Sequence, residues 1–93
     1  MYGIMDVRTI RRLRKRIDKL RLQAAGVRPR QLKALAVSVG RRQSKGGKHP
    51  TFVKDGRLPL TIPDHRKMNE YTVGNILDML EEDLYYEEEG KDV

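Results

Sequence analysis

The chain contains two histidines, and the first of them, His49, directly follows RRQSKGGK (residues 41–48), a run of cations and glycines. An imidazole has an unperturbed pKa of about 6.5, so it can take up and release a proton near neutral pH. Beside a phosphate it can act as a general base on a ribose 2′-hydroxyl or as a general acid on the departing 5′-oxygen. These residues make His49 a candidate catalytic residue for RNA cleavage. The alternative is a polar histidine that only supports a strand.

Several residues around His49 have the chemistry needed to hold RNA. Glycines let the backbone approach a phosphate closely, and cations stabilise the charge that develops during phosphoryl transfer. The residues expected to contact RNA are Arg41, Arg42, Lys45, Gly46, Gly47, Lys48, Lys54 and Arg57. His65 is a possible supporting residue. No metal site and no cofactor are predicted, because the spacing of the two histidines matches no recognised ligand pattern.

The charge of the chain is divided unevenly between its two halves. The 93 residues carry a net charge of +7, yet residues 1–57 hold 17 Lys and Arg against 3 Asp and Glu, and residues 58–93 hold 3 against 10. So basic a body favours a polyanion such as RNA as partner. Two alternatives remain, a solvated surface and an acidic protein partner. The acidic half either shields the basic face or serves solubility.

Composition also restricts the class of protein. There is no cysteine, so disulfides and thiolate metal sites are excluded. Apolar stretches are far shorter than the roughly 20 residues that span a bilayer, and no signal peptide is evident. We therefore expect a soluble cytoplasmic protein without membrane association.

Two helices are predicted in the first half of the chain. The first spans residues 6–25, with Asp6 as its cap and apolar residues every three or four positions along a cationic rod. The second has Pro29 in its first turn and is stopped by Gly40.

The second half is predicted to hold a small sheet and a closing helix. Short strands fit residues near 41–45, 49–54 and 58–62, and Asp55-Gly56 predicts a type I′ turn. A helix begins at Thr72 and runs to about residue 86, and the chain end is expected to fray. The order predicts an α+β fold of two layers, with helices on one face of an antiparallel sheet.

Three segments in this order resemble the HicA-type toxins of bacterial toxin–antitoxin systems. The segments are GKHPTFV (47–53), LTIPDH (60–65) and the helix TVGNILDMLEEDL (72–84). The positions that fall on the family pattern are Gly47, His49, Phe52, Leu60, Ile62, Pro63 and His65. Two departures are Lys48, where the family usually has serine, and Pro50 after the histidine.

The resemblance implies a double-stranded-RNA-binding-domain-like α-β-β-β-α fold and the activity of a metal-independent mRNA interferase. It implies His49 as the catalytic residue, mRNA as substrate and a HicB-type antitoxin as protein partner. The alternative is a non-catalytic nucleic-acid-binding module on the same fold.

Three regions follow from these assignments: a basic amphipathic helical extension (residues 1–28), a HicA-like domain (residues 29–84) and an acidic tail (residues 85–93). The extension lies outside the family pattern. It is expected to pack along the domain, to extend the RNA-binding surface or to mediate a homodimer.

Overall fold

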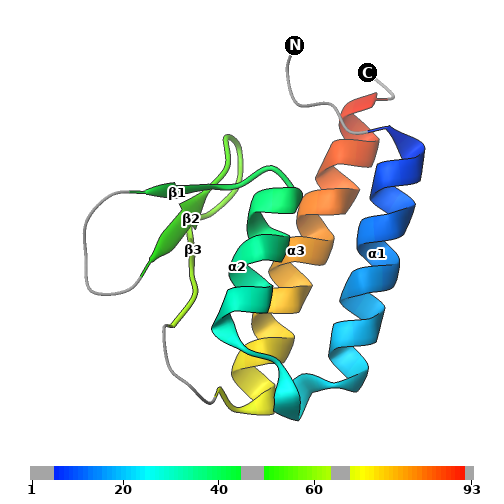
Figure 1. Cartoon of the computed structure of the whole chain (residues 1–93). Coiled ribbons are helices and arrows are strands. Elements are labelled where there is room, and N and C mark those ends of the chain that lie inside the picture. The colour runs from blue at the N-terminus through cyan, green and yellow to red at the C-terminus, as the bar shows by residue number, and fades with distance from the viewer. Residues whose placement is uncertain (1–5, 45–49, 64–67, 92–93) are drawn as a thin grey trace.

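The computed structural model describes residues 6–44, 50–63 and 68–91 (Figure 1). Three α-helices and a short 3₁₀ turn accompany a three-stranded antiparallel sheet, so the predicted α+β class is confirmed. In chain order the elements are α1 (Val7–Leu22), η1 (Ala24–Gly26), α2 (Pro29–Ser38), β1 (Arg42–Ser44), β2 (Thr51–Val53), β3 (Leu60–Thr61) and α3 (Glu70–Lys91).

The first helix begins where its cap predicts. The Oδ1 atom of Asp6 accepts a hydrogen bond from the backbone N–H of Thr9 at 2.8 Å, which satisfies a donor that the helix leaves unpaired. The helix ends at Leu22, earlier than predicted, and the 3₁₀ turn follows it. One stripe of α1 is buried, formed by Ile10, Leu13, Ile17 and Leu20.

Both ends of α2 lie as predicted. Pro29 occupies the first turn, and the side chain of Gln31 accepts a hydrogen bond from the N–H of Arg28 at 2.8 Å. At the other end Gly40 has a φ of +103°, a conformation that L-residues rarely adopt. A Cβ at Gly40 would also lie 2.7 Å from the Nζ of Lys54. The backbone conformation therefore favours glycine at this position, and any other residue would also have to displace the end of the Lys54 side chain.

The three strands pair in the order β1-β2-β3. Gln43 lies opposite Phe52, and Phe52 lies opposite Leu60. The turn between β2 and β3 differs from the prediction. Gly56 has a φ of +81°, but no residue other than glycine has a positive φ among the described residues. A type I′ turn needs a positive φ at both of its central residues, so Asp55 and Gly56 do not form one. A single positive φ at the third residue, with the N–H of Arg57 bonded to the carbonyl of Lys54 at 3.0 Å, is typical of a type II turn.

The last helix is longer than predicted at both ends. It is capped by Asn69, whose Oδ1 accepts from the N–H of Thr72 at 2.8 Å, and not by Thr72. At the other end the helix continues to Lys91, so the prediction of a frayed tail after about residue 86 is wrong. Contacts from the rest of the chain explain the extension, because Lys54 binds Glu87 and Arg14 binds Glu88.

α3 packs against both α1 and α2, and the sheet lies beside α2 (Figure 1). α1 runs antiparallel to α3, as the pairs Arg14–Glu88 and Arg21–Glu81 show. The apolar stripe of α1 joins one hydrophobic core with residues of α2, the sheet and α3. The sequence predicts three alternatives for the N-terminal extension (residues 1–28). The described residues show the first of them, packing along the rest of the domain.

Candidate nucleic-acid interface

The predicted catalytic residue and several of its neighbours lie outside the described residues. These are Lys45, Gly46, Gly47, Lys48, His49 and the possible supporting residue His65. The structure describes the residues on either side of the first segment. Ser44 at the end of β1 pairs with Thr51 at the start of β2, so the segment that contains His49 joins two strand ends that lie opposite each other.

Arg41 has a different role from the predicted one. Its side chain is buried, with a relative exposure of 2% for the residue, and both oxygens of Asp83 accept from it. The Nε–Oδ2 distance is 2.6 Å and the Nη2–Oδ1 distance is 3.0 Å. Its Nη1 donates to the carbonyl oxygens of Phe52 and Leu58, at 2.9 Å each. Because Arg41 is buried and each of its three side-chain nitrogens is hydrogen-bonded, its assignment to RNA phosphates is corrected: it joins the sheet to α3.

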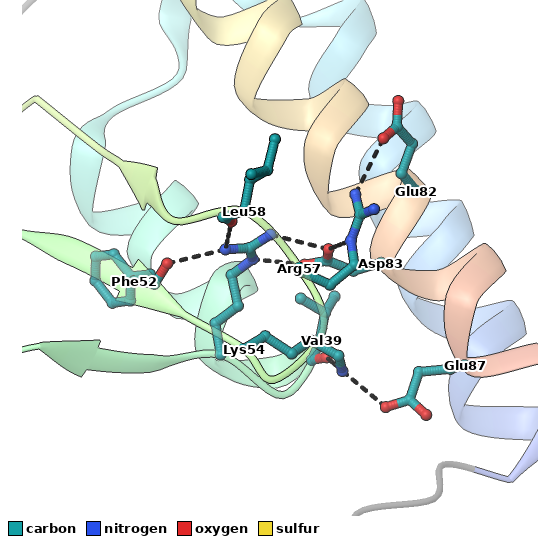
Figure 2. Close-up of polar contacts among 9 residues, drawn as sticks. Val39, Phe52, Lys54, Arg57, Leu58, Glu82, Asp83 and Glu87 are labelled. Carbon is teal, nitrogen blue, oxygen red and sulfur yellow. Dashed lines mark hydrogen bonds and ion pairs between the residues drawn. The ribbon is translucent and has the colours of Figure 1, made fainter. Parts of the chain in front are cut away.

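Lys54 and Arg57 also point toward α3 (Figure 2). The Nζ of Lys54 donates to the carbonyl of Val39 at 2.8 Å and to Glu87 at 2.7 Å. The guanidinium of Arg57 donates to Asp83 at 2.9 Å and to Glu82 at 3.0 Å. Both side chains are therefore already paired with carboxylates, which argues against the predicted contacts with phosphate.

The hydrogen bond to Asp83, followed by the one to Glu82, raises the pKa of Arg57 above its ordinary value. For Arg21, burial acts to lower the pKa, but hydrogen bonds to Asp78 and Glu81 outweigh it and raise the pKa as well. A raised pKa on a cation means that the charged form is stabilised in the folded state. Both guanidinium groups therefore stay charged at any pH near neutrality. Within that range, deprotonation of the arginine does not break either ion pair.

Among the described members of the predicted set, only Arg42 is exposed. It lies on β1, whose three residues are all exposed. Arg41 and Arg42 are neighbours in the sequence but face opposite ways, as successive residues near a strand do. Arg42 therefore remains a candidate for phosphate contact, beside the segment that contains His49.

The largest set of exposed cations lies on α1, where the sequence predicts no specific site residue. Arg14 binds Glu88 and lies 5.1 Å from the centre of the Tyr85 ring, and Arg21 binds Asp78 and Glu81 at 2.7 and 2.6 Å. The remaining cations of the helix are exposed and have no ion-pair partner among the described residues. They are Arg8, Arg11, Arg12, Lys15, Arg16 and Lys19.

A signal for this division is present in the sequence. At 100° per residue, Arg14 and Arg21 share one flank of the helix, while Lys15 and Lys19 lie opposite the apolar stripe. Sequence reasoning recognises the cationic rod, but separating its paired from its unpaired members also needs the position of α3.

No helix within the described ranges combines the length and the apolar character needed to cross a membrane. Comparisons with protein-family models, with curated proteins and with solved structures found no match to this chain.

Proposed function

We propose that this protein is a toxin-type endoribonuclease that cleaves mRNA without a metal ion and is blocked by a HicB-type antitoxin. The proposal takes its chemistry from the motifs around His49 and His65 and from their resemblance to HicA-type toxins. The order α2-β1-β2-β3-α3 agrees with the α-β-β-β-α order of a double-stranded-RNA-binding-domain-like fold. The cytoplasm, where mRNA is translated, is the proposed site of action.

The proposal that the protein binds RNA rests on where the cations without a carboxylate partner lie among the described residues. Carboxylates of α3 bind the cations that face them, namely Arg14, Arg21, Arg41, Lys54 and Arg57. Most of the exposed cations with no carboxylate partner among the described residues lie on α1, and the others are Arg28, Arg30 and Arg42. Such a surface attracts a polyanion and gains free energy by releasing its counterions.

In the proposed reaction His49 moves the protons. It takes the proton from the ribose 2′-hydroxyl or gives one to the departing 5′-oxygen, while Arg42, Lys45 and Lys48 hold the phosphate. Arg41, Lys54 and Arg57 are left out of this set because α3 engages them. Proton transfer by one positioned side chain typically accelerates a reaction by about 10²–10⁴-fold.

The test compares RNA cleavage by the wild type and by His49→Ala under single-turnover conditions with a metal chelator present. We expect the substitution to slow cleavage by at least about 100-fold while RNA affinity stays within about threefold. Asn75→Ala is the matched control, because Asn75 is exposed on α3, and it should cleave like the wild type. Equal cleavage by His49→Ala and the wild type would remove His49 from the mechanism.

One observation favours a second candidate, a non-catalytic RNA-binding module. Three of the cations predicted to surround the reacting phosphate, Arg41, Lys54 and Arg57, are already bound to carboxylates. Fewer cations then remain to stabilise the charge that develops on the phosphate. Salt-dependent RNA binding by the wild type without any cleavage would select this candidate over the nuclease.

A further inference from the structure

The six exposed cations of α1 form a continuous surface, which we call the outer face of α1. Its members are Arg8, Arg11, Arg12, Lys15, Arg16 and Lys19. Asp18 is the single acidic residue within the helix. Arg8 and Lys19 are eleven residues apart, which corresponds to about 16 Å along a helix that rises 1.5 Å per residue. The outer face is therefore a linear array of charge.

Packing fixes this array in place. Ile10, Leu13, Ile17 and Leu20 are buried against the core, so the opposite side of α1 must face solvent. Arg14 and Arg21 bind α3 on one flank of the helix. Because the nearby acids of α3 are occupied by these two arginines, the outer face keeps its charge.

A groove lies on the other flank of α1, toward α2. It has a volume of about 480 Å³ and is lined by Lys15, Arg16, Lys19, Leu20, Gln23 and Gln31. Three of these residues are cations and two are amides, with one leucine among them. Gln31 is held in position by the hydrogen bond from the N–H of Arg28. The groove is therefore a hollow with several hydrogen-bond donors and no lining carboxylate.

We propose that the outer face of α1 and this groove bind the phosphate backbone of RNA. The inference rests on the proposed function, and it assigns RNA docking to a helix outside the pattern shared with HicA-type toxins. Phosphate contacts fix the position and register of a nucleic acid without reading its sequence. The docking surface would thus hold RNA independently of the residue that cleaves it.

The chemistry of the surface favours RNA over a membrane or an acidic protein. A helix that enters a membrane surface needs a free apolar face, but the apolar face of α1 is buried. The large apolar residues of α1 that are exposed, Val7 and Leu22, stand at its two ends. Protein interfaces centre on apolar and aromatic anchors and are depleted of lysine. The outer face has no such anchor between its ends.

The test uses the full chain with the changes Lys15→Gln, Arg16→Gln and Lys19→Gln together, which we call the groove variant. The probe is a 2′-O-methyl RNA oligonucleotide, which lacks the 2′-hydroxyl needed for cleavage. Each phosphate contact adds about 0.7 to 0.9 to the slope of log Kd against log salt, so the loss of three contacts lowers that slope. We expect the slope to fall by about 2, with binding about 100-fold weaker at 0.1 M salt and nearly equal to that of the wild type near 1 M.

A control lowers the net charge by the same three units elsewhere, through Val37→Glu, Tyr71→Glu and Asn75→Glu at three exposed residues of α2 and α3. This control should bind much more tightly than the groove variant, and both should unfold at similar temperatures. Equal weakening of both variants, or an unchanged slope in the groove variant, would overturn the proposal. Displacement of the RNA by polyglutamate at equal charge concentration would overturn it in favour of an acidic protein partner.

The outcome separates this inference from the proposed function. If the groove variant binds RNA like the wild type and still cleaves unmodified RNA, the docking surface is wrong and the nuclease stands. If the groove variant loses binding but the wild type cleaves no RNA, the docking surface stands and the nuclease is wrong.

Discussion

At the scale of single residues, Arg41 shows that two adjacent cations in a sequence can have different structural roles. It precedes Arg42 in a basic run, yet Arg42 is exposed whereas Arg41 is buried and bound to Asp83. A buried arginine needs a carboxylate and further acceptors, and here they come from Asp83, Phe52 and Leu58. Since Asp83 lies 42 residues away in the chain, local pattern could not reveal the pair.

The buried pair gives a test at this scale. Asp83→Asn should lower the free energy of unfolding by about 3–5 kcal/mol, because it leaves the charge of Arg41 buried without a counter-ion. Glu82→Gln is the matched control. Glu82 is largely exposed and binds Arg57 at the surface, so its loss should cost no more than about 1 kcal/mol. Urea unfolding followed by circular dichroism measures both, and equal losses would contradict the structural role of the Arg41–Asp83 pair.

At the scale of elements, local signals locate the helices and strands better than they locate the ends of α3. Asp6 and Gly40 mark helix boundaries that the structure confirms, because caps act within one turn. The chain beyond residue 86 was predicted to fray, yet it is helical to Lys91, where Glu87 and Glu88 bind partners from distant elements. Tertiary contacts of this kind override local propensity.

Two glycines in these elements should respond in opposite ways to alanine. Gly40→Ala should destabilise the fold by about 1–2 kcal/mol or more, because a residue with a Cβ is strained at positive φ and would crowd Lys54. Gly74→Ala should stabilise it by about 0.5–1 kcal/mol, because Gly74 is helical and a Cβ added there would have no atom within 4 Å. Thermal and urea unfolding of the two variants check the sign, and a stabilising Gly40→Ala would contradict the assigned turn.

At the scale of the whole molecule, the uneven charge of the sequence becomes a spatial arrangement. The acids of α3 bind cations from α1, the sheet and the turn after β2. These ion pairs join the elements, and in each of them the two charges neutralise each other. The sequence predicts the surplus of positive charge in residues 1–57 but assigns contact with RNA to residues 41–57. In the structure most of the exposed cations without a carboxylate partner among the described residues lie on α1, because Arg41, Lys54 and Arg57 face carboxylates of α3. The antiparallel sheet and the helix order are predicted correctly, while the pairing of charges depends on how the helices pack.

The most direct test of the proposed activity is mass spectrometry of the fragments that the purified protein makes from an RNA oligonucleotide in the presence of a metal chelator. The fragment masses identify the chemical groups at the new ends. Attack by the ribose 2′-hydroxyl, with His49 moving the proton, breaks the bond to the 5′-oxygen. We therefore predict fragments with a 2′,3′-cyclic phosphate on one side and a 5′-hydroxyl on the other. Uncleaved RNA, or fragments that end in a 3′-hydroxyl and a 5′-phosphate, would contradict the proposed chemistry.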